Sequence, residues 1–204
     1  MGLSATRAYA ASDVTVRMGD GNNTVDIYAL QSCSQMTLGS GNNTLKLYET
    51  FEGSRFSFGD GANCVTIYEM EQQSSLGFGN GSNALQIHEV HNSMANFGNG
   101  DNDILIHLMR GNAQVHTDNG NNLVRIDMMD DASQIRVGEG KNAFFIGRFA
   151  SGTSILDSLG QAFSESTRSA LTIQGLWGSL STLEAIRAER QTQGQPTILD
   201  LEKH

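Results

Sequence analysis

The chain has 204 residues, a formal net charge of −9, 23 glycines, two cysteines and one proline. An acidic chain without a basic patch repels phosphate backbones, which excludes nucleic acid as a partner, and two cysteines make no disulfide framework. No apolar run approaches the length of a membrane span, so no transmembrane segment is expected.

Residues 1–13 show no period and are expected to form a lead-in to the fold. Val14, Val16 and Met18 then alternate with other residues, which predicts a first strand. That strand leads into a five-residue turn of the form Gly-x-Gly-x-Asn at residues 19–23. The closing asparagine returns every 20 residues, with one interval of 19, and such a period is typical of a solenoid. The seven turns end at Asn23, Asn43, Asn63, Asn83, Asn102, Asn122 and Asn142.

After each of these asparagines, the second and fourth residues are apolar and the third is mostly polar. This alternation predicts a strand with one buried face. Leu105 and Phe145 break the polar third position, so we expect another part of the chain to cover them. The residues predicted to face inward are Val25, Ile27, Leu45, Leu47, Val65, Ile67, Leu85, Ile87, Ile104, Ile106, Val124, Ile126, Phe144 and Ile146.

The second half of each coil contains a small residue, usually serine, followed by an apolar pair such as Phe56 and Phe58. A second, shorter strand in each coil is therefore expected. Coils stacked about 4.8 Å apart would then form two facing parallel sheets. The predicted fold is all-β: a right-handed parallel β-roll, or β-solenoid, of about seven 20-residue coils over residues 14–156.

The period is lost over residues 157–204, which are expected to form a helical C-terminal cap. Apolar residues such as Leu183 and Ile186 have the spacing of amphipathic helices, and two helices broken near Gly175 or Gly178 are predicted. We expect these helices to lie over the last coil, and Thr197–Leu201 to form a short closing strand. At the other end, the edge near Val14 has little sequence before it to cover it, which allows a homodimer through that end of the solenoid.

The glycine turn followed by alternating apolar residues resembles the repeats-in-toxin (RTX) family of calcium-binding β-rolls, over about residues 13–156. The repeat of that family is Gly-Gly-x-Gly-x-Asp-x-Φ-x, where Φ is apolar, with turns on both sides of the roll. Here the glycine turn occurs once per coil, as in one-sided adhesin solenoids, and asparagine replaces aspartate in all seven slots. The resemblance implies a secreted or cell-surface bacterial protein whose turns bind calcium.

Two states of the turns are compatible with these residues. Calcium takes oxygen ligands, largely carboxylates, and would use the asparagine oxygens with help from Asp20, Asp60 and Asp101 in the same turns. Alternatively, the stacked asparagines form an amide ladder in which each NH₂ donates to the next C=O, and no metal is needed.

A file of ring side chains is expected on the outside of the first sheet, with Glu49, Glu69 and Glu89 beside it. Stacked rings on a flat surface can bind sugar rings or polymers, whereas like residues in a row also stabilise the corners of a solenoid. Both interpretations stay open. The file consists of Tyr28, Tyr48, Tyr68, His88 and His107.

Four histidines lie in adjacent coils, at positions 88, 91, 107 and 116. A zinc site needs three ligands that converge, and His91 and His116 occupy different slots from the other two, so we expect no specific zinc site.

The pattern as a whole favours a non-catalytic module with a structural or adhesion-type role, binding a protein or a glycan surface. Acid–base catalysis needs a pair of carboxylates in a cleft, and coils without insertions offer no loops to build one. One alternative is an exported effector whose helical tail docks a protein partner. Another is a polysaccharide-acting enzyme.

Overall fold

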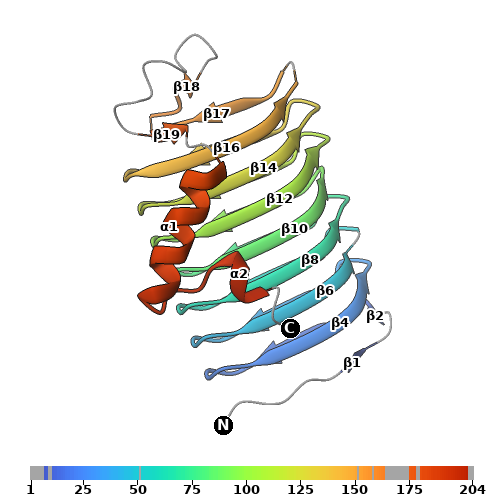
Figure 1. Ribbon diagram of the computed structural model, residues 1–204. Coiled ribbons are helices and arrows are strands. Elements are labelled where there is room, and N and C mark those ends of the chain that lie inside the picture. Colours follow the sequence, from blue (N-terminus) through green and yellow to red (C-terminus); the bar gives the residue numbers. More distant parts are fainter. Residues whose placement is uncertain are drawn as a thin grey trace.

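Two parallel sheets run the length of the molecule, because every coil contributes a long strand to one sheet and a short strand to the other (Figure 1). The computed structural model describes residues 7–8, 11–50, 52–150, 152–157, 159–163, 175–177 and 180–201. Over these residues the chain is a parallel β-solenoid of about seven coils, which confirms the predicted fold class.

The ten-stranded sheet contains the long strands that follow the glycine turns. Each strand pairs in parallel with the equivalent strand of the next coil, so that Val65 pairs with Leu85 and Leu85 with Ile104. In spatial order the strands are β1 (Arg7–Ala8), β4 (Thr24–Gln31), β6 (Thr44–Thr50), β8 (Cys64–Met70), β10 (Ala84–His91), β12 (Asp103–Arg110), β14 (Leu123–Met129), β16 (Asn142–Phe149) and β19 (Gly175–Trp177), and β2 (Ala11–Ser12) also pairs with β4.

The nine-stranded sheet contains the short strands. Its strands are parallel except for the last pair, β17 and β18, which is antiparallel. In chain order they are β3 (Thr15–Met18), β5 (Gln35–Leu38), β7 (Arg55–Phe58), β9 (Ser75–Phe78), β11 (Met94–Phe97), β13 (Gln114–Thr117), β15 (Gln134–Val137), β17 (Ser154–Leu156) and β18 (Ala162–Phe163).

The core lies between the two sheets. Leu85 and Ile87 of β10 face Ala95 and Phe97 of β11, and these four side chains are at most 3% exposed. The alternation of buried and outward residues along each strand is the one predicted from the sequence. A single coil supplies only one strand to each layer, so its apolar side chains are fully buried only when the neighbouring coils stack on it.

The two corners of each coil have different geometry. At the glycine turn, Gly41 has a φ of 131°, and a Cβ on it would lie 2.5 Å from the carbonyl oxygen of Gly21, so only glycine fits. At the second corner, two consecutive residues have positive φ, for example Gln72 (53°) and Gln73 (64°). In the 19-residue coil, this corner has a single residue with positive φ, Asn92 (47°). The coil is therefore one residue shorter at this corner, and both sheets keep their register.

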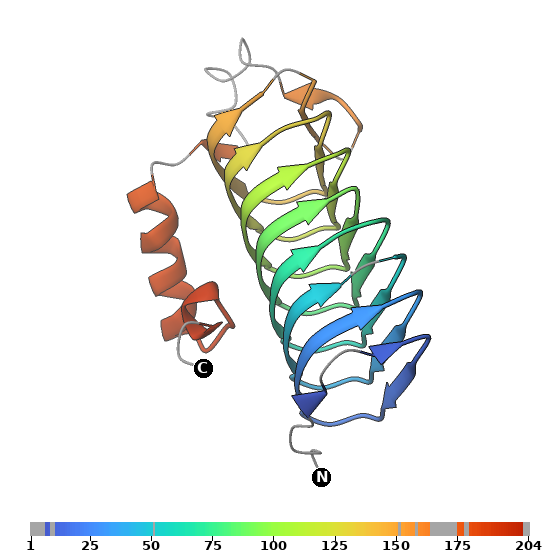
Figure 2. The same cartoon turned by 90° about the vertical axis from the view of Figure 1, so that its right-hand side faces the viewer.

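The C-terminal helix expected from the sequence is present, but its position differs from the expected one. Helix α1 (Leu180–Thr192) runs beside the ten-stranded sheet, along the axis of the rod, instead of lying over the last coil (Figure 2). The last coil is followed by strands: β19 pairs with β16, and β17 with β18. Residues 164–174, part of the predicted helical region, lie outside the described residues.

The segment predicted as a closing strand is a helix. Short helix α2 (Ile198–Leu201) contacts β8, β10 and β12, so the prediction of a strand at Thr197–Leu201 is wrong. Pro196 and Thr197 precede this helix, and threonine is favoured at the residue just before a helix begins. The run of apolar residues was compatible with either structure, and local capping together with tertiary contact favours the helix.

The outward apolar residues of the last coils determine where α1 lies. Leu123, Ala143 and Phe145 pack with Leu183 and Ile186 of α1 in an apolar cluster separate from the main core. The expected cover is confirmed in this cluster, which includes Phe145, and Leu105 is only 5% exposed. A helix over the end of the rod would have left these side chains in water, which is unfavourable in proportion to their apolar area.

A buried ion pair fixes the tail to the rod. The Nε of Arg187 donates to both carboxylate oxygens of Asp103 at 2.8 Å, and the two side chains are 2% and 0% exposed. Asp103 also accepts the backbone N–H of Ile198 at 3.1 Å, so one carboxylate holds both α1 and α2. Arg190, one turn further along α1, donates to backbone carbonyl groups of the nearby glycine turns, those of Asp101, Asn102 and Asn121.

At the N-terminal end, β3 is the first described strand of the nine-stranded sheet, and Val16 and Met18 are only partly buried. Residues 1–6 lie outside the described part of the chain. A homodimer through this end stays a prediction.

Candidate functional site

The seven closing asparagines form one continuous column inside the glycine turns, and none of them is more than 6% exposed. Each Nδ2 donates to the Oδ1 of the next asparagine at 2.8–3.0 Å, all the way from Asn23 to Asn142. The same group also donates within its own turn, for example from Asn83 to the carbonyl oxygen of Gly81 at 2.8 Å. The amide ladder predicted from the sequence is therefore present.

N–H donors saturate the side-chain oxygens of the column from Asn43 to Asn142. The Oδ1 of Asn83 accepts both the backbone N–H of Asn63 at 3.2 Å and its Nδ2 at 2.8 Å, and an amide oxygen has only two lone pairs. A calcium ion in the turns would need these oxygens as ligands. The Asn column therefore does not fit a calcium site, and its own amide bonds are complete.

Three acidic residues of the turns accept a backbone N–H of the next coil. One carboxylate oxygen of Asp60, for example, accepts the backbone N–H of Asn80 at 2.7 Å. Among the residues described, no group of three or more His, Cys, Asp or Glu side chains is placed to hold a metal ion. These carboxylates are thus further links between coils, and the same bond is made by Asp20 to Ser40 and by Asp101 to Asn121.

The predicted ring side chains form a continuous stack along the corner of the ten-stranded sheet. We call Tyr28, Tyr48, Tyr68, His88 and His107 the aromatic file. Successive ring centroids are 5.6, 4.9, 4.6 and 4.7 Å apart, and the interplanar angle falls to 5° and 2° in the middle of the file. Each inner ring therefore covers the faces of its neighbours, so a sugar cannot stack on those faces. The ring edges, with their hydroxyl groups and imidazole nitrogens, are what the file offers to a ligand.

The C-terminal end of the file is fixed by a carboxylate. His107 Nδ1 lies 2.7 Å from Asp127 Oδ2, and Arg125 Nε donates to the other oxygen of Asp127 at 2.9 Å. Partial burial would raise the pKa of Asp127, but the hydrogen bonds from His107 and Arg125 outweigh it and leave that pKa below its usual value. The ionised carboxylate places a proton on Nδ1 of His107, and the ring tilts by 36° from His88 to reach it.

His88, the fourth of the five rings in the aromatic file, has a pKa shifted toward the neutral imidazole. Burial lowers the pKa of His88, and the neighbouring His107 lowers it further. His91 and His116 lie away from His88 and His107. His91 lies at the second corner against Gly111, and His116 is in β13 of the other sheet, 3.9 Å from Asp118.

The predicted row of glutamates runs beside the file. Glu49, Glu69 and Glu89 are in register on adjacent strands. Burial raises the pKa of Glu69, and repulsion from Glu49, Glu71 and Glu89 adds to the shift. Arg110 relieves part of this repulsion through an ion pair with Glu89.

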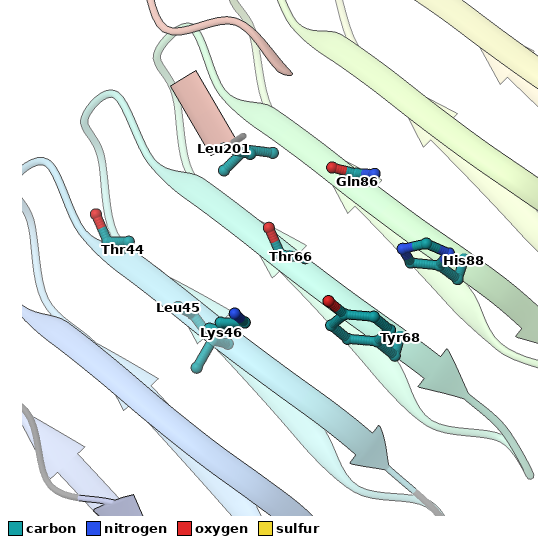
Figure 3. Close-up of a pocket in the computed structure, with 8 residues that line it drawn as sticks. All are labelled: Thr44, Leu45, Lys46, Thr66, Tyr68, Gln86, His88 and Leu201. Carbon is teal, nitrogen blue, oxygen red and sulfur yellow. The ribbon is translucent and has the colours of Figure 1, made fainter. Parts of the chain in front are cut away.

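A cavity of about 390 Å³ lies on the other side of the file, where α2 meets the ten-stranded sheet (Figure 3). Its floor is the outer face of β6, β8 and β10, and Leu201 of α2 lies over it. Figure 3 shows Tyr68 lying along β8 with its hydroxyl on the side of Thr66. We call this the flank cavity; its lining residues are Thr44, Leu45, Lys46, Thr66, Tyr68, Gln86, His88 and Leu201.

The sequence placed Tyr68 and His88 on the surface but missed the flank cavity. One signal was present: Lys46, Thr66 and Gln86 hold the same third position in three successive coils, so the repeat puts them in one row. The wall made by Leu201 carried no such signal, because nothing in the repeat indicates where the C-terminal tail returns.

The row of ring edges and the flank cavity form one surface that can hydrogen-bond a polar ligand. Hydroxyl, amide, amine and imidazole groups converge there beside an aromatic ring, a mixture typical of binding pockets. Neither described helix is long and apolar enough to cross a membrane. Comparison with models of protein families, with curated proteins and with solved structures returned no match to this chain.

Proposed function

We propose that the chain is a non-catalytic binding module of a secreted or cell-surface bacterial protein, with an adhesion-type role, and that its ligand is a glycan. The observation that carries the proposal is the flank cavity beside the aromatic file on the outer face of the ten-stranded sheet. The distant likeness of its turns to the RTX β-rolls supports the extracellular assignment.

The rigidity of the rod supports a binding role. The polar groups of Lys46, Thr66 and Gln86 stand on three paired strands, whose backbones are held in register by the ladder of the sheet. The backbone that carries these groups is therefore in place before a ligand binds, and only side-chain rotamers are left to be ordered on binding. A glycan presents many hydroxyl groups along its length, which suits a row of donors and acceptors.

The tail contacts favour this proposal over a tail that docks a partner protein. Leu183 is 0% exposed and packs with Leu123 and Ala143, and Ile186 packs against the same cluster. These side chains are therefore occupied by the rod itself. A docking role would require the tail to leave the rod and break the Arg187–Asp103 ion pair.

The experiment is a screen of immobilised glycans with the intact chain, followed by calorimetric titration of any ligand found. Thr66→Val removes a hydroxyl from the flank cavity, and Thr37→Val is the matched control on the outer face of β5. We expect the first variant to weaken binding about fivefold, as the loss of a hydrogen bond of about 1 kcal/mol would, and the second to leave it unchanged.

Failure to bind any glycan, or equal affinity of the two variants and the wild type, would overturn the proposal. Turnover of a polysaccharide by the intact chain would also overturn it, in favour of an enzyme.

A further inference from the structure

The flank cavity has an unusual charge for this protein. The chain carries 22 acidic and 13 basic residues, yet among the described residues that line the cavity the only fixed charge is the ammonium group of Lys46. The other polar lining groups are hydroxyls, an amide and the imidazole of His88.

Lys46 is held beside the aromatic file. Its Nζ lies 5.4 Å from the ring centroid of Tyr48, a distance within the range of cation–π contacts. Asp26, on β4, is in register with Lys46 but is not part of the cavity lining. No carboxylate is among the described residues that line the cavity together with this ammonium group.

From this arrangement, and resting on the glycan-binding function proposed above, we infer that the flank cavity binds a saccharide that carries a carboxylate, a uronic acid residue within a largely neutral glycan. The carboxylate would pair with Lys46, and Thr66, Gln86 and the Tyr68 hydroxyl would meet the ring hydroxyls.

Two physical arguments select an isolated carboxylate over other anions. A phosphate dianion is usually recognised by several donors or by the planar fork of arginine, and no arginine is among the described lining residues. A polymer with a charge on every unit would be repelled by a protein of net charge −9, whereas a single carboxylate experiences little of that long-range field.

The test compares two oligosaccharides that differ only in charge: a tetrasaccharide with one glucuronic acid, and its reduced form in which the carboxylate has become a neutral hydroxymethyl group. We expect the intact protein to bind the acidic form at least tenfold more tightly at low salt, and the preference to shrink as ionic strength rises. Lys46→Gln should remove the preference. Lys46→Arg, which retains the charge, should keep most of it.

Lys141→Gln is the control, because Lys141 is an exposed lysine in a glycine turn of the last coil. Thermal unfolding of each variant checks that the rod remains folded. Equal affinity of the wild type for the two oligosaccharides, or an undiminished preference in Lys46→Gln, would overturn the inference.

The two proposals fail in distinguishable ways. If neutral glycans bind and the Thr66→Val variant weakens them, the glycan-binding function stands and only the acidic preference is refuted. If neither the acidic, the reduced nor any other glycan binds, both are refuted.

Discussion

Asn83 makes the bonds of a mid-column residue in full. Its Oδ1 accepts two N–H groups of Asn63, and its Nδ2 donates to Asn102 and to Gly81. In Asn83→Ala, buried donors on one side and acceptors on the other lose their partners, and we expect a loss of about 2–4 kcal/mol in unfolding free energy. Denaturant titration measures it.

The matched variant is Asn23→Ala at the start of the column, where no described group donates to the side-chain oxygen. We expect a clearly smaller loss there. If Asn83→Ala and Asn23→Ala lowered the unfolding free energy equally, backbone stacking, and not the amide column, would hold the coils together.

Glu69 gives a prediction about pH. Its pKa is raised in the folded protein, so the folded state favours the protonated form. The resulting penalty is present above the folded pKa and disappears as the pH falls below it. Glu69→Gln should therefore stabilise the protein near pH 7, by less than about 0.5 kcal/mol because the side chain is mostly solvated, and should have no effect near pH 3.

Thermal unfolding at the two pH values measures the effect, with Glu184→Gln, exposed on α1, as control. A stabilisation that persists in acid would contradict the electrostatic explanation.

At the scale of elements, the tail is attached by contacts separate from the core of the rod. In Arg187→Met, the carboxylate of Asp103 stays buried, and among the described residues only the N–H of Ile198 is left as its partner. Loss of one member of such a pair typically costs about 3–5 kcal/mol. We expect α1 and α2 to leave the rod while the strands remain folded, and hydrogen exchange should show protection lost only in the helices.

Adding Asp103→Leu should restore the tail, apart from about 1 kcal/mol for the N–H of Ile198 that loses its acceptor. Leucine is suited to this slot, because Leu123 occupies it in the next coil and packs against α1. If the single variant unfolded rod and tail together, the two would form one cooperative unit.

At the scale of the whole molecule, the saturated Asn column bears on calcium. Every asparagine oxygen from Asn43 to Asn142 already accepts a donor from the preceding coil at 3.2 Å or less. We therefore expect the same melting temperature and circular dichroism spectrum in millimolar calcium and in chelator. A rise of several degrees with calcium would show that the ion displaces these bonds or uses the outer carboxylates.

The sequence predicted the rod well, because the same turn and the same alternation of apolar residues occur in seven successive coils. The alternation around Val65 and Ile67 recurs in every coil, and the exceptions at Leu105 and Phe145 indicated that something covers the last coils. It did not predict what covers them. Arg187 and Asp103 are 84 residues apart, and their pairing depends on where a non-repeating tail returns, which no local pattern encodes.

The candidate site also has a part that the repeat predicts and a part that depends on the non-repeating tail. Tyr68 and His88 could be placed on the surface because they share a repeat slot, and the stacking of like rings follows from the register. The flank cavity exists only because Leu201 comes to rest beside these strands. The wall that Leu201 forms therefore depends on tertiary packing, and the spacing of residues in the repeat could not predict it.

The one-residue corner at Asn92 has a consequence for engineering. A coil can lose a residue there while β10 and β12 on one side, and β9, β11 and β13 on the other, stay paired. The glycine turn lacks this tolerance, because a Cβ on Gly81 would lie 2.2 Å from the carbonyl oxygen of Gly61. Foreign peptides grafted between Val90 and Ser93 should thus be displayed from an undisturbed scaffold, whereas the same grafts beside Gly81 should prevent folding.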